Sequence, residues 1–419
     1  MGNVLNFKQH FDQLTEFLKP YEGMWNEELL DDYPRHMAPY QDSWIDELSA
    51  LSKEQLWRFD CFLETEHIQN PEILELSKKR KDLIELEQFK IYEKKSYTEW
   101  AFKKVKEKKR HEISLITSLI TELNDDHSFS HTTDIGGGVG HLARILAHYC
   151  GIKTKTIDIE ADFQKSGIKR ANAYPLPKGA NDLEFINMNF IGDKDQEIMK
   201  NVFSKDSLTL GLHTCGPLAN ALIETHITMG TKILLNFGCC YLKMNPETDV
   251  NLSQYAKQGN HLKLKKWALT MASRGYTSMN FNEYLLKERV KSFRYSLQLL
   301  LNKIVGKSHF VSVGDGHSRE YWGDFSDYAM KRLKVLNLDS GYNEELLTEF
   351  YEDADIKKEV KRMYLGNILR WQFGRCLEHY ILTDRCLLLE EAGQSVELKE
   401  LFDEELSPRN IGILATQKI

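Results

Sequence analysis

At 419 residues the chain exceeds one ordinary domain, so we expect a core with one or two additional parts. An apolar fraction of 42%, a charged fraction of 28% and a net charge of -7 indicate a soluble globular protein and exclude a disordered chain. No apolar run approaches the roughly 18 residues of a membrane-spanning helix, and residues 1–6 lack the pattern of a signal peptide or a myristoylation site. The 7 cysteines have no framework spacing, which predicts reduced thiols and a cytoplasmic location without a membrane partner.

The N-terminal part of the chain, residues 1–105, is predicted to be helical. Apolar residues recur there at helical spacing. Ser52 followed by Gln55 three residues later matches a capping box, so a helix is expected to begin after Ser52.

A basic segment with interleaved aromatic side chains spans residues 78–110 and includes Trp100. Such a segment can follow a nucleic-acid backbone and stack on bases, which makes RNA a candidate partner. The alternative is the solvated face of one long helix, in which acidic residues pair with the basic ones at i,i+4 spacing. The sequence leaves both interpretations open.

From about residue 131 the pattern changes to strands that alternate with helices, which is typical of a doubly wound α/β sheet. Helical patterning returns after Tyr241, and two strand-like segments close to the C-terminus are expected to complete the sheet. The expected strands are Thr132–Ile135, Lys153–Ile159, Leu183–Met188, Ser207–Leu212, Lys232–Phe237, Val396–Asp403 and Asn410–Thr416.

These patterns predict a division of the chain into four parts. Residues 1–105 form a helical region, and 106–245 form a Rossmann-like nucleotide-binding core. Residues 246–375 form a mostly helical insertion. Residues 376–419 return to the core with a helix and two strands.

A glycine-rich turn follows the first expected strand and has the form D-x-G-x-G-x-G, from Asp134 to Gly140. A helix follows it, and Asp158 ends the next strand, which is the arrangement of a nucleotide-binding βαβ unit. Glycine at Gly136, Gly138 and Gly140 lets the backbone approach a ligand closely. Asp158 is expected to accept hydrogen bonds from two ribose hydroxyls.

Two nucleotides fit this unit. The pyrophosphate of NAD(P) would lie at the N-terminus of the helix, and residues 138–143 match that pattern. S-adenosylmethionine has no phosphate and carries an ammonium group, which the carboxylate of Asp134 suits and a pyrophosphate would not. The sequence therefore favours S-adenosylmethionine, and a turn that binds no ligand is the remaining alternative.

Polar side chains follow the third and fourth expected strands. Ligands lie beyond the carboxyl ends of parallel strands, so Asn189 is expected to bind the adenine edge of the cofactor. His213 is expected in the same crevice, as a catalytic base, as a contact to the cofactor or substrate, or as a structural histidine.

Thiols lie beyond the fourth and fifth expected strands. Cys215, Cys239 and Cys240 are expected to line the crevice, with the last two on the substrate side. Their spacing lacks the patterns of zinc sites, so no metal is predicted. Tyr241 is a second candidate catalytic residue, and Lys243 a candidate contact to the substrate.

Several short segments resemble the methyltransferase-like protein 25 family. The H-T-C-G and G-C-C-Y elements, in this order and at this separation, are more specific than the glycine turn. A more distant similarity is to tRNA 2′-O-methyltransferases, although the zinc-finger spacings of those enzymes are missing here. The matching segments are Lys109–Ile113, Asp134–Gly140, Leu212–Gly216, Gly238–Tyr241, Leu382–Arg385, Leu401–Asp403 and Ser407–Asn410.

The resemblance implies a seven-stranded, Rossmann-like class I methyltransferase sheet that uses S-adenosylmethionine. It places the cofactor on Asp134 and the glycines of the turn and its ribose on Asp158. The expected function is methyl transfer to RNA, with a protein acceptor, a non-catalytic cofactor-binding module and an NAD(P) oxidoreductase as alternatives. Arg409 and Asn410, between the last two strands, are expected on the substrate side.

Overall fold

The computed structural model describes residues 5–192, 196–259, 261–274, 279–306, 309–314 and 316–418. Residues 1–4, on which part of the signal-peptide and myristoylation prediction rests, lie outside the described residues. Among the helices that are described, none combines the length and apolar character that crossing a bilayer requires. The chain forms two compact units: Met1–Glu16, Leu83–Tyr276 and Cys376–Ile419 make the first, and Phe17–Asp82 with Thr277–Arg375 make the second.

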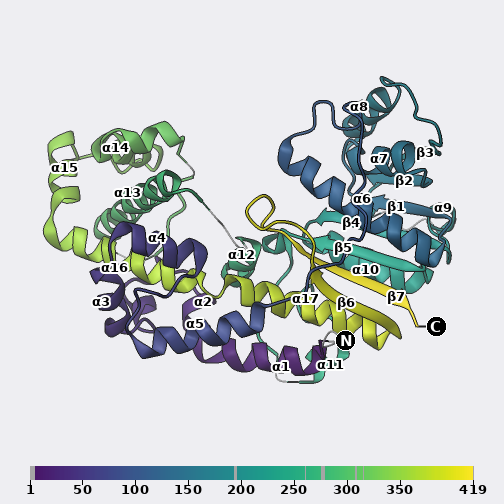
Figure 1. Cartoon of the computed structure of the whole chain (residues 1–419). Coiled ribbons are helices and arrows are strands. Elements are labelled where there is room, and N and C mark those ends of the chain that lie inside the picture. The colour runs from purple at the N-terminus through teal and green to yellow at the C-terminus, as the bar shows by residue number, and fades with distance from the viewer. Residues whose placement is uncertain are drawn as a thin grey trace. The chain divides into compact units, whose positions relative to one another are not determined.

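A seven-stranded sheet with the order β3-β2-β1-β4-β5-β7-β6 lies at the centre of the first unit (Figure 1). Strands β1 to β5 are parallel, whereas β7 runs antiparallel to both β5 and β6. The strands are β1 (His131–Ile135), β2 (Thr154–Asp158), β3 (Leu183–Asn187), β4 (Ser207–Thr214), β5 (Ile233–Gly238), β6 (Gln394–Glu400) and β7 (Ile411–Gln417).

The seven strands lie where the sequence predicts them, with ends that differ by a few residues at most. The central strands β1 and β5 are buried at every position because helices cover both faces of a parallel sheet. The edge strand β6 instead alternates buried and exposed residues over its first five positions. The predicted closure of the sheet by two C-terminal strands is confirmed.

Helices of the first unit pack on this sheet around one apolar core. Ile116 and Ile120 from α6 and Ile145 from α7 meet Leu210 and Phe237 from the sheet. Pro217 begins α10, where its missing N–H costs no hydrogen bond. The helices are α6 (Glu107–His127), α7 (His141–Cys150), α8 (Ala161–Ala171), α9 (Gln196–Val202), α10 (Pro217–Met229), α11 (Gln254–Gln258), α12 (Lys266–Arg274) and α17 (Gly374–Glu391), while α1 (Phe7–Leu18) begins in this unit.

The second unit is helical. Ser52 forms the predicted capping box with Gln55, and Asn280 forms another with Glu283 at the start of α13. A cluster that includes Phe293 is the core of this unit. Its helices are α2 (Glu22–Trp25), α3 (Asp42–Ala50), α4 (Lys53–Phe62), α5 (Pro71–Ile84), α13 (Phe281–Val305), α14 (Phe325–Val335), α15 (Glu344–Glu352) and α16 (Ala354–Trp371), with short 3-10 turns between some of them.

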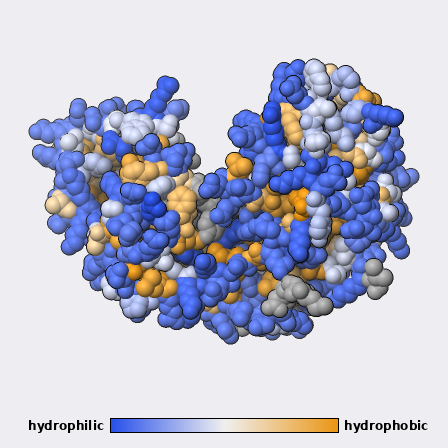
Figure 2. Space-filling view, in the orientation of Figure 1, coloured by the Kyte–Doolittle hydropathy of each residue, from blue (hydrophilic) through white to orange (hydrophobic). Residues whose placement is uncertain are grey.

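The units do not follow the order of the sequence, because the second unit joins helices from before β1 with helices from between β5 and β6. The four-part division of the sequence stays a prediction. On the visible face of each unit the surface is mostly hydrophilic, with apolar side chains in small groups (Figure 2). This distribution is normal for folded proteins.

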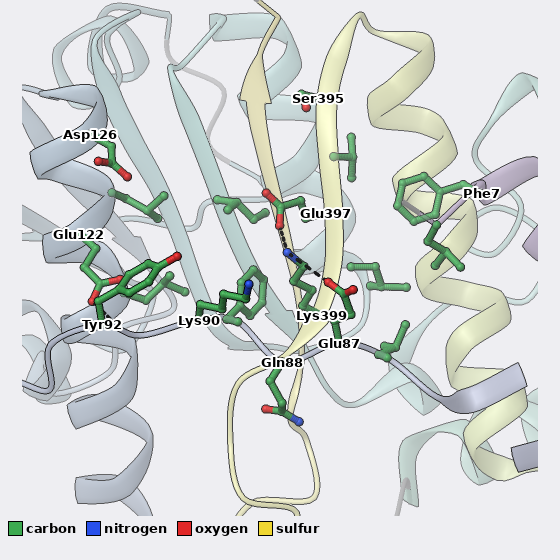
Figure 3. A pocket seen from close by; sticks show the side chains of 18 of the residues that line it. Phe7, Glu87, Gln88, Lys90, Tyr92, Glu122, Asp126, Ser395, Glu397 and Lys399 are labelled. Atoms are coloured by element: carbon green, nitrogen blue, oxygen red, sulfur yellow. Dashed lines mark hydrogen bonds and ion pairs between the residues drawn. The ribbon is translucent and has the colours of Figure 1, made fainter. Parts of the chain in front are cut away.

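The interpretation of residues 78–110 as one long helix is wrong. Helix α5 ends at Ile84, α6 begins at Glu107, and residues 85–106, all of them described, form turns and extended segments. The segment pairs with the edge of the sheet: Phe89 N donates to Glu400 O at 2.8 Å, and Glu400 N donates to Glu87 O at 3.0 Å. Figure 3 shows Glu87 and Gln88 beside the strand that carries Lys399. The segment thereby covers the β6 edge, which would otherwise present open backbone groups.

We predict that the C-terminal strand pair is an integral part of the core. A Cβ atom at Gly412 would lie 2.5 Å from Cε1 of Phe237, whose ring centroid is 4.9 Å from that of Phe402. Gly412→Ala should therefore lower the free energy of unfolding by about 1–3 kcal/mol through overpacking, measured by urea denaturation. Ser395→Ala at an exposed position of β6 is the control and should change it by less than about 0.5 kcal/mol. Equal stability of the two variants would contradict this placement.

Candidate functional site

The carboxyl ends of the parallel strands meet at one edge of the sheet. Strand β1 pairs with both β2 and β4, and β4 pairs with β5. The glycine turn, Asp158, His213 and the cysteine pair after β5 therefore follow four neighbouring strands. Residues that lie far apart in the sequence thus lie at the same edge of the sheet, and the predicted ligand crevice between them stays a prediction.

The glycine turn between β1 and α7 has a left-handed backbone at Gly136, Gly138 and Gly140, with φ of 71°, 59° and 67°. A Cβ atom at Gly140 would lie 2.7 Å from the ring of Phe185, so packing requires glycine there. At Gly138 no atom lies within 4 Å of such a Cβ. The turn is therefore open at Gly138, on a side where a ligand could approach the backbone.

Asp158 at the end of β2 is held against this turn. Its Oδ2 accepts a hydrogen bond from Gly138 N at 2.8 Å, and its Oδ1 accepts one from Glu160 N at 2.9 Å. Each carboxylate oxygen can accept a second hydrogen bond. The geometry fits the predicted contact to two ribose hydroxyls, which stays a prediction.

Asp134 lies beneath the turn and is 2% exposed. Its Oδ2 is buried and has no hydrogen-bond partner among the described residues. Burial raises the pKa of Asp134 to about 7, with the positive charge of Lys109 opposing and the negative charge of Asp158 adding to the shift. A buried acceptor without a donor, next to an open glycine turn, fits a cofactor that brings an ammonium group.

Asn189 lies exposed in the loop after β3, where its side-chain oxygen accepts a hydrogen bond from Gly192 N at 3.2 Å. Asn187, which the sequence analysis did not select, donates to Asp158 O and Ile159 O, both at 2.9 Å. Asn187 therefore positions the strand end that carries Asp158. The predicted contact of Asn189 with adenine stays a prediction.

His213 occupies an irregular position in β4, where the pairing with β5 shifts register, and its φ is 63°. A left-handed backbone is costly for a residue with a Cβ atom and persists only where the surroundings enforce it. Here Nε2 of His213 lies 2.9 Å from Oε1 of Glu112 on α6. Glu112 is fully buried and also accepts a hydrogen bond from Ser407 Oγ at 2.7 Å.

Three segments of the predicted family resemblance therefore meet at the Glu112 carboxylate. The sequence analysis quoted the segments of Glu112 and Ser407 but did not select either residue for the site. An acidic residue among apolar positions of α6 was the available signal, because an isolated carboxylate on a buried helix face needs partners.

The charge of Glu112 determines the direction of its hydrogen bond with His213. Burial by itself would raise the pKa of Glu112, but the hydrogen bond and charge of His213 outweigh burial and, with help from Lys109, hold that pKa at about 2. Glu112 is thus ionised at neutral pH and accepts hydrogen bonds only. The Nε2 atom of His213 therefore donates to Glu112, so Nδ1 is the ring nitrogen that can accept a proton.

The three cysteines beyond β4 and β5 form one cluster. Sγ of Cys215 lies 3.2 Å from Sγ of Cys239, which lies 3.6 Å from Sγ of Cys240. The hydrogen bond of Cys239, opposed by burial, lowers the pKa of Cys215 to about 5, while the pKa of Cys239 is raised. All seven cysteines are free in the structure, and their redox state stays a prediction.

Tyr241 is a buried side chain. It is 3% exposed, its hydroxyl donates to Glu378 Oε1 at 3.2 Å, and burial raises its pKa well above the usual value of a tyrosine. Such a phenol does not act as a base at neutral pH, so these contacts favour a structural role. Lys243 is exposed near Cys215, and its positive charge acts on that thiol.

The turn before β7 carries Arg409 and Asn410. Arg409 Nη1 lies 3.4 Å from Ala272 O and 3.9 Å from Glu378 Oε1, and its positive charge acts on Cys240. Asn410 is 1% exposed, which favours a structural role for this side chain. Contact of either residue with a substrate stays a prediction.

A family model described as "Methyltransferase domain" matches residues 103–247. The chain is also similar to curated proteins named "Probable methyltransferase-like protein 25". The identity is 26% over 228 residues of the Mus musculus protein and 26% over 235 residues of the Homo sapiens protein. These matches cover 51% and 53% of this chain but 38% of each relative, so the chain spans well under half the length of the relatives it matches.

Solved structures with some likeness include magnesium protoporphyrin IX methyltransferase from Synechocystis PCC 6803 with bound SAM. It is 14% identical, and the match covers 46% of this chain and 83% of that chain with a TM-score of 0.25. The plantazolicin methyltransferase BpumL in complex with SAH is 11% identical over 90% of this chain and 98% of that chain, also with a TM-score of 0.25. Because TM-scores of 0.25 are too low to support an argument, the fold assignment rests on the strand order of the sheet.

The match over residues 103–247 supports the predicted methyltransferase domain and, with it, S-adenosylmethionine over NAD(P) as the cofactor. The strand order, with β7 antiparallel between β5 and β6, is the sheet that the resemblance implies.

Asp158 should contribute directly to cofactor affinity. Asp158→Ala leaves the ribose hydroxyls without their acceptor, so calorimetry should show S-adenosylmethionine binding weakened by about 1–3 kcal/mol. The control is Asp162→Ala on α8, whose carboxylate is exposed and lies 3.5 Å from Lys165 Nζ. That variant should bind like the wild type. Unchanged affinity after Asp158→Ala would refute the ribose contact.

Cofactor affinity should rise with pH through the titration of Asp134. Its carboxyl group is largely neutral below its pKa of about 7 and ionised above it. Because the ionised form pairs with the ammonium group of the cofactor, affinity should increase between about pH 5.5 and 7.5, by at most tenfold per pH unit. Asp134→Asn should flatten this dependence in the same titrations, whereas a pH dependence that survives the substitution would exclude Asp134 as its origin.

Proposed function

We propose that this chain, which carries a class I methyltransferase domain that uses S-adenosylmethionine, transfers the methyl group to RNA. The observation that carries the choice of RNA is the basic, aromatic-bearing segment of residues 94–110, which leads from an exposed surface to the cofactor crevice. A protein acceptor remains the alternative that the experiments below distinguish.

The outer part of this segment combines an exposed ring with positive charge. Trp100 is 48% exposed, and Lys103 Nζ lies 4.5 Å from the centroid of its ring. The ring of Tyr174 lies 5.6 Å from that of Trp100, and Lys104 is exposed. Stacking on aromatic side chains and attraction of phosphates by lysines are the two contributions that single-stranded RNA binding needs.

The inner end of the segment reaches the candidate site. Lys109 Nζ lies 3.5 Å from Glu112 Oε2, and its positive charge acts on the carboxyl group of Asp134. Positive charge therefore continues from Trp100 to the crevice between the glycine turn and His213. A strand of RNA that follows this charge would bring an acceptor group to His213.

Bound S-adenosylmethionine supplies an electrophilic methyl group on a sulfonium. The protein must hold the acceptor in line with that methyl group and receive a proton if the acceptor is a hydroxyl or an amine. His213 suits this task, because ionised Glu112 binds its Nε2–H and leaves Nδ1 free to accept the proton. Ser407 holds the Glu112 carboxylate through a hydrogen bond, and the left-handed backbone of His213 sets the direction of its side chain, so the imidazole stays oriented.

Removal of the base should impair turnover but not cofactor binding. His213→Gln should lower the rate of methyl transfer to total RNA by about 10²–10⁴-fold, with the Kd for S-adenosylmethionine unchanged. Glu112→Gln should lower the rate by a smaller factor, because it keeps an acceptor but loses the charge that orients His213. Glu107→Gln, at an exposed position of the same helix, is the control and should behave like the wild type. Full activity of His213→Gln would contradict the mechanism.

The basic segment should determine RNA affinity through its salt dependence. In filter-binding titrations, Lys103→Glu with Lys104→Glu should weaken RNA binding and reduce the slope of log K against log salt by about 0.7 for each lost phosphate contact. The control pair, Lys153→Glu with Lys205→Glu, makes the same change of charge at the opposite, amino edge of the sheet. Equal effects of the two pairs, or no RNA retention by the wild type, would favour a protein acceptor.

A further inference from the structure

Three thiols from two different loops converge at the carboxyl edge of the sheet. The Sγ atoms of Cys215, Cys239 and Cys240 all lie within 4.8 Å of one another, and the two shortest separations are 3.2 and 3.6 Å. Zinc–sulfur bonds of about 2.3 Å in a tetrahedral site separate two sulfur ligands by roughly 3.8 Å. These two separations lie about 0.2 to 0.6 Å below that value, so small shifts of the side chains would bring the sulfurs to zinc-binding distance, and both exceed the roughly 2.05 Å of a disulfide bond.

The sheet explains why the spacing in the sequence lacks the pattern of a zinc site. Thr214 at the end of β4 lies opposite Gly238 at the end of β5, so Cys215 and Cys239 follow paired positions of neighbouring strands. Cys240 then extends the second loop by one residue. The ligand set is thus assembled by strand pairing, whereas the familiar C-x-x-C pattern assembles it within one loop.

The surroundings of the cluster suit a metal with thiolate ligands. The positive charges of Lys243 and Arg409 act on Cys215 and Cys240 and favour the negative charge that thiolate ligation brings. Cys239 is buried at 6% exposure, while Cys215 and Cys240 are half-buried. The cluster therefore has a fixed inner wall and an outer side through which an ion can enter.

We propose that Cys215, Cys239 and Cys240 bind a single zinc ion beside the cofactor crevice. Three protein ligands leave the fourth tetrahedral position for water or for a donor atom of the methyl acceptor, as in zinc sites that keep an open position. This inference goes beyond methyl transfer and does not depend on the identity of the acceptor.

The test uses the full chain, purified with a chelator under reducing conditions and then titrated with Zn²⁺ against a chromophoric chelator. A parallel titration with Co²⁺ reports ligation directly, because thiolate-to-cobalt charge-transfer absorption appears only when sulfur binds the ion. The expected result is one tightly bound Zn²⁺ per chain and a charge-transfer band. Cys215→Ser and Cys240→Ser should each weaken Zn²⁺ binding by at least about tenfold, since even the loss of an outer partner of a zinc ligand costs roughly 10- to 100-fold.

Cys150→Ser is the matched control, because Cys150 is also half-buried but lies at the end of α7, where its Sγ is 3.5 Å from Tyr97 Oη. It should keep wild-type Zn²⁺ affinity and the cobalt band. Circular dichroism melts and S-adenosylmethionine binding of the variants show whether the fold is retained. A wild type that binds no Zn²⁺, a band unaffected by both cluster substitutions, or a Cys215–Cys239 disulfide in protein kept reduced would overturn the proposal.

Discussion

The candidate site depends on one buried charge, the carboxylate of Glu112. An ionised group without access to solvent is costly unless hydrogen bonds and opposite charges compensate it. Here His213 and Ser407 supply the hydrogen bonds and Lys109 supplies positive charge, so helix α6, strand β4 and the turn before β7 are held together at one point. The same contact keeps the strained backbone of His213 in place and determines which nitrogen of its ring can accept a proton.

The order of the sheet is what allows this contact to form. Ser407 is 295 residues from Glu112 in the sequence, and it reaches the site because β7 returns to lie between β5 and β6. Gly412 and Phe237 pack closely where β7 meets β5, so the return of the chain belongs to the same core that supports the crevice. The residues predicted to bind the cofactor lie mainly on β1, β2 and their turns, whereas those predicted for the acceptor side include residues of the turn before β7.

The strands, the glycine turn and the position of Asp158 were predictable because each rests on local patterns: runs of apolar residues, glycines and an acid at fixed spacing. The contact of Glu112 with His213 was not, since the residues lie 101 positions apart and nothing in a short window indicates a left-handed histidine. In the structure, the helical region predicted for residues 1–105 does not include 85–106, where hydrogen bonds of Glu87 and Phe89 with Glu400 attach the segment to the β6 edge. The three cysteines were expected beyond neighbouring strands, but no metal site was predicted for them, because strand pairing and not spacing in the sequence brings their thiols within 4.8 Å.

The central claim is that the crevice between the glycine turn and His213 transfers a methyl group to RNA. The most direct measurement is the transfer of isotope from methyl-labelled S-adenosylmethionine into cell extract that is then separated into RNA and protein. Label should enter the RNA fraction with the wild-type chain, resist protease, be lost on nuclease treatment and fall to background with His213→Gln. Label in protein alone would assign a different acceptor, and the absence of transfer to either fraction, with the cofactor bound, would contradict the account.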